Sequence, residues 1–317
     1  MSPALGLPTM EFEQHVAGDN VWLHGRNTDA SQELIACVSH ALSYEVLESE
    51  DLVGQAMFAE LTDAAARKPD DLTVVILGGR GGQALHRLLG EKAKTSEIDD
   101  LLGRLNVFTQ DALAPMRMDN AFSFVRDFER LLGDAFFKKV KSFTSMQTDA
   151  DDLESGLLSF LDQLESCGPI DIFFLGLGPE AEGASHLAYI KPGSGARAND
   201  IAGLIPISRD ILEHHIRKFK VGGAATNEAD EAECRRASHI LTLGPASILC
   251  AKRIVQSIVD AATAPGKVAS FERLIKTEIS NDPSVRAQQL DENPGLWIRL
   301  NPNVRSLVLP DVLASAH

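Results

Sequence analysis

Two polar segments of this chain follow apolar runs and hold residues that can move a proton. Asp111 ends the run RLNVFTQD, and His186 follows IDIFFLGLG together with Glu180. A carboxylate shielded from water can remove a proton from a carbon beside a carbonyl, although aspartate at a strand end commonly caps a turn or helix. A histidine oriented by a carboxylate transfers protons near neutral pH; the alternative is a structural histidine held by a backbone carbonyl. Asp111 and His186 are therefore candidate proton-transfer residues.

A glycine-rich segment, GGRGG at residues 78–82, lies between an apolar run and a helical pattern. Gly79, Gly81 and Gly82 allow the backbone to approach an anion, and the following helix offers free N–H groups. The Arg80 guanidinium can bind phosphate through two hydrogen bonds. The segment matches neither the Walker pattern nor GxGxxG, so the alternative is a tight turn with an exposed arginine.

Strand-like and helix-like segments alternate along the chain. Apolar runs predict strands at 72–79, 104–111, 170–178, 237–244 and 305–311. Helical spacing predicts helices at 83–94, 120–137, 151–168 and 246–262. This alternation indicates an α/β fold, with a mainly parallel Rossmann-like sheet and helices on both faces. Ligands bind beyond the carboxyl ends of such strands, so the three polar segments are expected to converge on one site.

No linker divides the sequence, so we expect a single domain at 31–317, preceded by an N-terminal extension at 1–30. The net charge of -15 argues against sequence-independent binding to nucleic acid or to an anionic membrane. The start of the chain lacks a secretory pattern, and no apolar run has the length of a membrane span. The four cysteines are far apart and suggest no metal site, which is typical of a reduced, cytoplasmic protein.

The order of four motifs resembles the glucosamine-6-phosphate deaminase/6-phosphogluconolactonase family, and the deaminase branch more closely. Members have a glycine-rich phosphate loop, a strand ending in Phe-x-x-Asp-Glu, the segment GxGxDGHxAFNEPGS and a late T-x-G turn. The corresponding segments here are LGGRGGQALHRLL, FTQDALAP, GLGPEAEGASHLAYIKPGS and LTLGPASILCAKRI. The resemblance spans roughly residues 70 to 310. It implies a cytoplasmic α/β protein that uses no cofactor and leaves a homo-oligomer open.

The resemblance also implies roles for individual residues. Asp111 matches the aspartate that moves a proton between two carbons, and His186 matches the ring-opening histidine. Glu180 stands at the family's second aspartate if AEGA is an insertion. Arg209 matches an arginine that binds the sugar phosphate, and Arg80 lies in the phosphate loop.

Several positions depart from the family pattern. Lys191 replaces the glutamate that partners the histidine, Ser238 replaces a phosphate-binding lysine, and Ala112 replaces the acid after the catalytic aspartate. The phosphate loop has Arg80 and Gly81 where Ser or Thr is usual.

The sequence accordingly favours a sugar-phosphate isomerase or deaminase acting on an amino-sugar phosphate such as glucosamine 6-phosphate. Two alternatives remain open at this point. One is a 6-phosphogluconolactonase-type hydrolase, in which His186 activates water. The other is a non-catalytic sugar-phosphate sensor on the same fold, which the loss of the glutamate at Lys191 favours and the retention of Asp111 disfavours.

Overall fold

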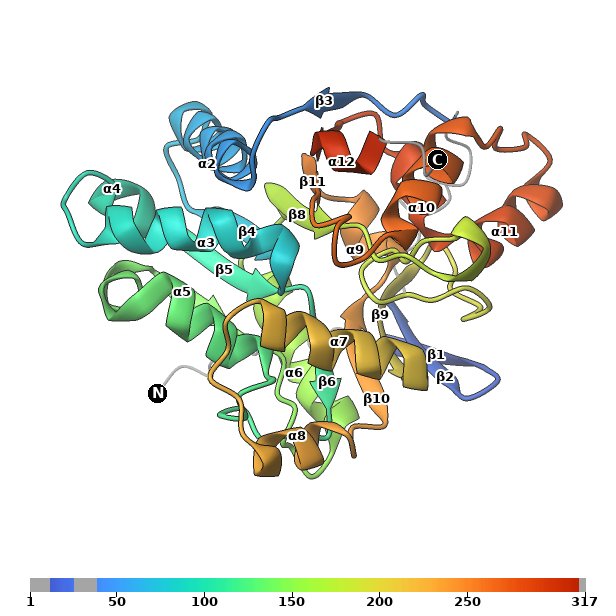
Figure 1. Cartoon of the computed structure of the whole chain (residues 1–317), viewed down its shortest axis with the longest axis horizontal. Helices are drawn as coiled ribbons and strands as arrows, with labels where there is room; N and C mark the ends of the chain where they lie inside the picture. The colour runs from blue at the N-terminus through green and yellow to red at the C-terminus, as the bar shows by residue number, and fades with distance from the viewer. Residues whose placement is uncertain (1–11, 26–38, 314–317) are drawn as a thin grey trace, which may run out of the picture.

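Within the residues described by the computed structural model, 12–25 and 39–313, seven strands form a parallel sheet (Figure 1). Every neighbouring pair in this sheet is parallel. In spatial order the strands are β3 (Tyr44–Val46), β12 (Val304–Val308), β11 (Ile254–Ile258), β8 (Ile172–Gly176), β4 (Leu72–Ile76), β5 (Leu105–Thr109) and β7 (Ser142–Thr144). The prediction of a mainly parallel sheet is confirmed.

Helices cover both faces of this sheet. Alternate side chains of each strand point to opposite faces, and both sets are apolar, so each face packs against helices. Val75 and Phe173 enter one apolar cluster with α6, whereas Val74 and Phe174 enter a second cluster with α2, α3 and α5. These helices are α6 (Leu153–Ser166), α2 (Glu50–Arg67), α3 (Arg80–Ala93) and α5 (Phe124–Lys139). Asp152 caps α6 by accepting hydrogen bonds from the backbone N–H groups of Glu154 and Ser155.

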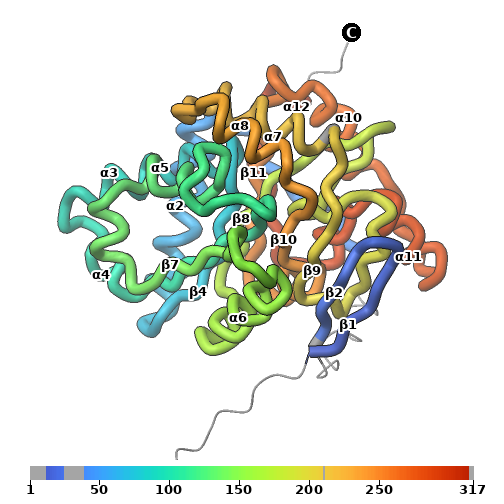
Figure 2. The backbone as a smooth tube through the Cα atoms, turned by 90° about the horizontal axis from the view of Figure 1, so that it is seen from below, coloured from blue at the N-terminus to red at the C-terminus, as the bar shows by residue number. Residues whose placement is uncertain are grey.

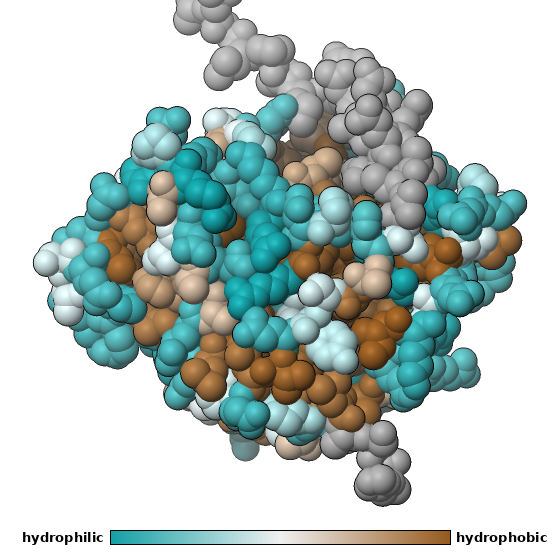
Figure 3. All heavy atoms as spheres, turned by 90° about the horizontal axis from the view of Figure 1, so that it is seen from above, coloured by the Kyte–Doolittle hydropathy of each residue, from teal (hydrophilic) through white to brown (hydrophobic). Residues whose placement is uncertain are grey.

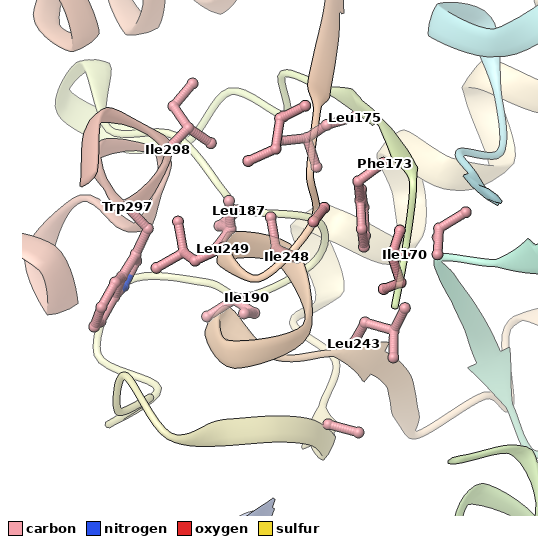
Figure 4. Close-up of a cluster of buried hydrophobic side chains, with 14 of the residues drawn as sticks. Ile170, Phe173, Leu175, Leu187, Ile190, Leu243, Ile248, Leu249, Trp297 and Ile298 are labelled. Atoms are coloured by element: carbon pink, nitrogen blue, oxygen red, sulfur yellow. The ribbon is translucent and has the colours of Figure 1, made fainter. Parts of the chain in front are cut away.

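The first apolar cluster extends beyond the sheet to the C-terminal part of the chain. Side chains of β8 meet those of α9 (Pro245–Leu249), β10 (His239–Leu243) and the 3-10 helix η2 (Pro294–Leu300), as Figure 4 shows. The members labelled there include Phe173, Leu175, Leu243, Ile248 and Trp297. This packing fixes the segment after β8, since Leu187 and Ile190 belong to the same cluster.

A second, antiparallel sheet was not predicted from the sequence. Its spatial order is β1 (Phe12–Ala17), β2 (Asn20–Gly25), β9 (Asp200–Pro206), β10 and β6 (Asp111–Ala114). Each neighbouring pair is antiparallel. The segment 237–244 thus forms a strand, as expected, but the strand lies in this sheet and not in the parallel one. Only Gln110 separates β5 from β6, so Asp111 stands where the chain passes from one sheet to the other.

The predicted helix at 246–262 is wrong over most of its length. Only Pro245–Leu249 is helical there, and Ile254–Ile258 forms β11 near the middle of the parallel sheet. Every residue of β11 is buried. A strand buried on both faces shows no polar alternation, and its apolar run cannot be told from a buried helix by periodicity.

The hairpin of β1 and β2 lies beside β9 at one end of the antiparallel sheet (Figure 2). It falls within the predicted N-terminal extension, whose boundary near residue 30 lies outside the described residues, as does Cys37. The remaining helices are α4 (Asp99–Leu102), the 3-10 helix η1 (Ala181–Gly183), α7 (Arg209–Val221), α8 (Glu228–Cys234), α10 (Gly266–Lys276), α11 (Pro283–Glu292) and α12 (Pro310–Leu313).

The surface seen in Figure 3 is mostly hydrophilic, with hydrophobic residues gathered in smaller patches between the polar ones. Among the described residues, none of the helices combines the length and the apolar character that crossing a membrane requires.

Candidate active site

A cavity of about 230 Å³ opens beyond the carboxyl ends of the parallel strands. Residues that follow β4, β5 and β8 line it, together with Ser257 near the end of β11. The lining includes Arg80, Gly81, Asp111, Glu180 and His186. The three polar segments that the sequence singles out therefore converge, at the edge of the sheet where an open α/β fold binds its ligands. The other lining side chains come mainly from α7 and the start of α10.

Asp111 is almost completely buried, with 3% of its surface exposed. Burial raises the pKa of Asp111 to about 6, although a hydrogen bond from Gln110 and the positive charge of Lys218 oppose this effect. A carboxylate with this pKa is ionised at neutral pH and is a stronger base than an exposed one. Asp111 thus combines access to the cavity with the basicity that a proton transfer requires.

His186 and Glu180 form the second titratable unit of the cavity. The His186 side chain is buried, and its Nε2 atom is hydrogen-bonded to Oε1 of Glu180. This hydrogen bond is the main reason why the pKa of Glu180 lies below its ordinary value. The carboxylate fixes the orientation of the imidazole, as a proton-transferring histidine needs. Glu182, the other glutamate between β8 and His186, does not line the cavity, whereas Glu180 does.

The segment between β8 and β9 folds back on itself to hold this pair. Short antiparallel bridges join Pro179 to Ser185 and Leu187 to Ile190. The hydroxyl of Ser270 on α10 donates to the carbonyl of Ala184. This turn places His186 beside the carboxyl end of β8. There the backbone N–H of His186 donates to the carbonyl of Gly178 at 2.9 Å.

Gly178 leaves the space that the imidazole occupies. A Cβ atom at this position would lie 2.8 Å from Nδ1 of His186. We expect Gly178→Ala to displace the ring from Glu180 and to lower turnover about a hundred-fold, the loss that a shift of about 1 Å can cause. Steady-state kinetics checks this expectation. Gly156→Ala in α6 is the control, since its new methyl group meets no atom closer than 3.5 Å; equal activities for the two variants would contradict it.

The glycine-rich segment begins α3 and lies beside the cavity, but its arginine already has carboxylate partners. Arg80 forms an ion pair with Glu50, and its Nε atom is 3.7 Å from Asp260. Asp260 adopts a left-handed backbone conformation with φ of 68°. The carboxylates of Glu50 and Asp260 therefore hold Arg80 at the edge of the site. A bound anion would compete with these carboxylates for the guanidinium group.

Three further basic side chains, which the sequence analysis missed, reach the cavity. Lys218 and His214 project from α7, and Lys267 lies at the start of α10. Burial lowers the pKa of Lys267 to about 8 and also lowers the pKa of Lys218. Burial, with the charge of Lys218 second, lowers the pKa of His214 to about 4. The only signal in the sequence is the i, i+4 spacing of His214 and Lys218, which places both on one helix face.

Lys218 lies over the glycine-rich loop. Its Nζ atom donates to the hydroxyl of Tyr189 at 3.2 Å and would lie 2.9 Å from a Cβ atom at Gly79. Gly79 has φ of 74°, a backbone conformation that favours glycine, and a methyl group there would also displace the end of the Lys218 side chain. Lys218 and the loop residues Gly78 and Gly81 line the cavity together.

Two positions that the comparison of motifs singled out do not line the cavity. Arg209 is exposed at the first position of α7, roughly 13 Å along the helix axis from Lys218. Lys191, at the position of the family's glutamate, donates from Nζ to the carbonyl of Pro206 at 2.9 Å. The carboxylate partner of His186 is therefore Glu180, and Lys191 does not take that role.

No protein-family model matches the chain. Its sequence is 29% identical over 153 residues to glucosamine-6-phosphate deaminases from Staphylococcus aureus strains JH9 and Newman, an alignment that covers 48% of this chain. The chain spans about half the length of the curated relatives it matches, 52% in both cases.

Solved structures match over most of the chain. A monomeric glucosamine-6-phosphate deaminase superposes with a TM-score of 0.64 at 18% identity, covering 86% of this chain and 98% of the other. The 6-phosphogluconolactonase from Thermotoga maritima superposes with a TM-score of 0.57 at 14% identity, covering 84% and 99%. The sequence and structure comparisons agree with the resemblance found in the motifs, and the chain has the fold of the glucosamine-6-phosphate deaminase/6-phosphogluconolactonase superfamily.

Proposed function

We propose that the chain is an aldose–ketose isomerase or deaminase of an amino-sugar phosphate such as glucosamine 6-phosphate. The observation that carries this proposal is the buried carboxylate of Asp111, which shares one cavity with the hydrogen-bonded pair of His186 and Glu180. The names of the relatives support the class of substrate.

The two titratable units suit two successive steps. The imidazole of His186, oriented by Glu180, transfers the proton between the ring oxygen and the anomeric hydroxyl as the sugar ring opens. Asp111 then takes the proton from C2 of the open-chain aldehyde and delivers it to C1, while the C1 oxygen gains a proton and the C2 amine or hydroxyl loses one. C1 becomes a hydroxymethyl group, and C2 becomes an imine in an amino sugar or a ketone in a neutral sugar. At a pKa of about 6 this carboxylate is ionised at neutral pH, and its conjugate acid readily returns the proton. Release of ammonia follows hydrolysis of the C2 imine when the substrate is an amino sugar.

The phosphate of the substrate is assigned to the basic end of the cavity. Lys218 and Lys267 supply positive charge there, and the backbone of the glycine-rich loop at Gly81 supplies close approach. A chain with a net charge of -15 needs such a local concentration of positive charge to hold an anionic sugar.

We expect Lys218→Met and Lys267→Met each to weaken binding of the phosphorylated sugar about ten- to hundred-fold, the effect of losing a hydrogen bond to a charged group. Affinity for the unphosphorylated sugar should change little, and calorimetric titration measures both. Lys220→Met, an exposed position of the same helix, is the matched control. Arg209→Ala belongs in the same series: a larger loss there than at either lysine would move the phosphate site to the position that the resemblance implies.

A lactonase is the second candidate. The pair of His186 and Glu180 also suits activation of a water molecule for attack on a sugar lactone phosphate, and several lactonases have this fold. That reaction has no need of a base at Asp111 with a raised pKa, which is why the isomerase is preferred.

A panel of phosphorylated sugars and sugar lactones tests the proposal. Each compound is screened for thermal stabilisation, since a ligand that binds the folded state raises Tm. Stabilising compounds are then assayed for ammonia, for ketose product and for lactone hydrolysis. Formation of ketose or ammonia supports the proposal, whereas lactone hydrolysis alone selects the second candidate. Stabilisation without turnover of any compound would identify a sugar-phosphate sensor.

A further inference from the structure

Two histidines and an aspartate meet where the hairpin of β1 and β2 pairs with β9. Figure 2 shows this hairpin beside β9. His15 comes from β1, His24 from β2, and Asp200 is the first residue of β9. Their donor atoms all lie within 4.8 Å of one another. Asp111 belongs to β6 at the opposite end of this sheet.

Each member of this cluster has one buried polar atom that lacks a hydrogen-bond partner. These atoms are Nδ1 of His15, Nδ1 of His24 and Oδ1 of Asp200. The Asp200 side chain is completely buried, and the two histidine side chains are 11% and 15% exposed. Nδ1 of His15 is 3.2 Å from Oδ1 of Asp200, yet neither atom makes a hydrogen bond. Buried polar atoms without partners are rare, and an absent ion is one cause of them.

The outward atoms of the same side chains do have acceptors beside them. Nε2 of His15 is 3.4 Å from the carbonyl of Gly195, and Nε2 of His24 is 3.4 Å from a carboxylate oxygen of Glu13. Metal-binding histidines commonly donate one ring N–H to a carbonyl or carboxylate, which leaves the other nitrogen deprotonated toward the metal. In both histidines this places the free lone pair on Nδ1.

Asp200 is held in the same way. Its Oδ2 atom accepts a hydrogen bond from the backbone N–H of Arg197 at 2.6 Å, which leaves Oδ1 for the centre of the cluster.

We propose that His15, His24 and Asp200 bind a divalent transition-metal ion, with zinc as the preferred one. Two imidazole nitrogens and one carboxylate oxygen form a donor set that zinc takes readily, whereas calcium and magnesium prefer oxygen alone. Three protein ligands leave the fourth tetrahedral position to water. Bonds of about 2.0–2.1 Å place tetrahedral donors about 3.4 Å apart, so the ion draws the three side chains slightly together.

The role of this ion is structural. Its ligands join the N-terminal hairpin to a strand that begins 176 positions after His24, and no residue of the cavity belongs to the cluster.

The full chain, stripped with a chelator and then dialysed, is titrated with Zn²⁺ by calorimetry, and its bound metal is measured after gel filtration. We expect one zinc ion per chain and a rise in Tm of about 5 °C at a zinc concentration near 100 times Kd. His24→Gln and Asp200→Asn should remove both effects. The exposed His40 provides the control; His40→Gln should bind zinc and gain Tm as the wild type does.

His24→Gln is the decisive variant, because His24 is partly exposed and its replacement leaves the buried Asp200 in place. Its fold is checked by circular dichroism, and loss of zinc binding by the folded variant supports the site. Wild-type protein that binds no stoichiometric zinc at pH 8 overturns the proposal. Equal zinc binding by His24→Gln and wild type overturns it as well. Neither result depends on the activity at Asp111.

Discussion

Replacing Asp111 with asparagine is expected to lower turnover about a hundred- to ten-thousand-fold, the usual contribution of a positioned general base. Asparagine keeps the shape of the side chain and its contact with Gln110 but cannot accept a proton from carbon. Affinity for the substrate should remain within a few fold, because we propose that the phosphate binds at Lys218 and Lys267 and not at Asp111. Exchange of the C2 proton with deuterated water measures the step directly, and equal exchange by variant and wild type would exclude Asp111 as the base.

The pH dependence provides an independent check of the same residue. Burial raises the pKa of Asp111 to about 6, so the carboxylate is ionised and active above that pH and becomes protonated below it. The exchange rate should therefore fall as the pH decreases through about 6, roughly two units above the value expected for an exposed aspartate. A profile that stays flat down to pH 4 would indicate a different base.

His186→Gln is expected to lower turnover of the ring-forming substrate about a hundred-fold, the lower end of the range for proton transfer by a positioned side chain. Glutamine retains a polar contact with Glu180 but cannot carry the proton. Glu180→Gln should act in the same direction with a smaller loss, because it keeps the imidazole and removes only the charge that orients it. Steady-state kinetics of the two variants measures both effects.

An acyclic substrate analogue, which lacks the hydroxyl groups that close the ring, separates the two proton-transfer groups. His186→Gln should process this analogue at nearly the wild-type rate, whereas Asp111→Asn should remain slow with it. If His186→Gln is equally impaired with cyclic and acyclic compounds, His186 does not act in ring opening.

The sequence predicts the strands that are buried on both faces and bounded by glycine. Strands β4 and β8 are of this kind, since LTVVI and IFFLG each run into a glycine-rich turn. It does not predict β11, because IVQSI follows another apolar segment with no glycine or proline between them. Most of the antiparallel sheet was not predicted for a different reason. Strand β2 pairs with β9 and β10 pairs with β6 across long stretches of chain, and no local pattern encodes these pairings.

The residues of the candidate site likewise fall into two groups, those that the sequence indicates and those that only the fold brings to the cavity. Asp111 and His186 were accessible to sequence reasoning because each follows a recognisable strand, and the fold brings such strand ends together. Lys218 and Lys267 were not, because their role depends on where α7 and α10 pack. For Arg209 the match to a motif is local, and the structure places this residue at the exposed first position of α7. Its role in phosphate binding stays a prediction that Arg209→Ala tests.

The edge strand β3 has a consequence for how the protein is made. Its three residues, Tyr44–Val46, are all exposed and pair only with β12 in the parallel sheet. An ion pair between Glu45 and Arg305 crosses this junction, over a separation of 260 residues. Strand β12 must therefore have left the ribosome before β3 can pair with it. Until then the backbone N–H and C=O groups of β3 remain free to pair with other strands. The pairing of β3 with β12 therefore forms late in synthesis. The nascent chain is exposed to aggregation for longer than a chain whose neighbouring strands are close in sequence.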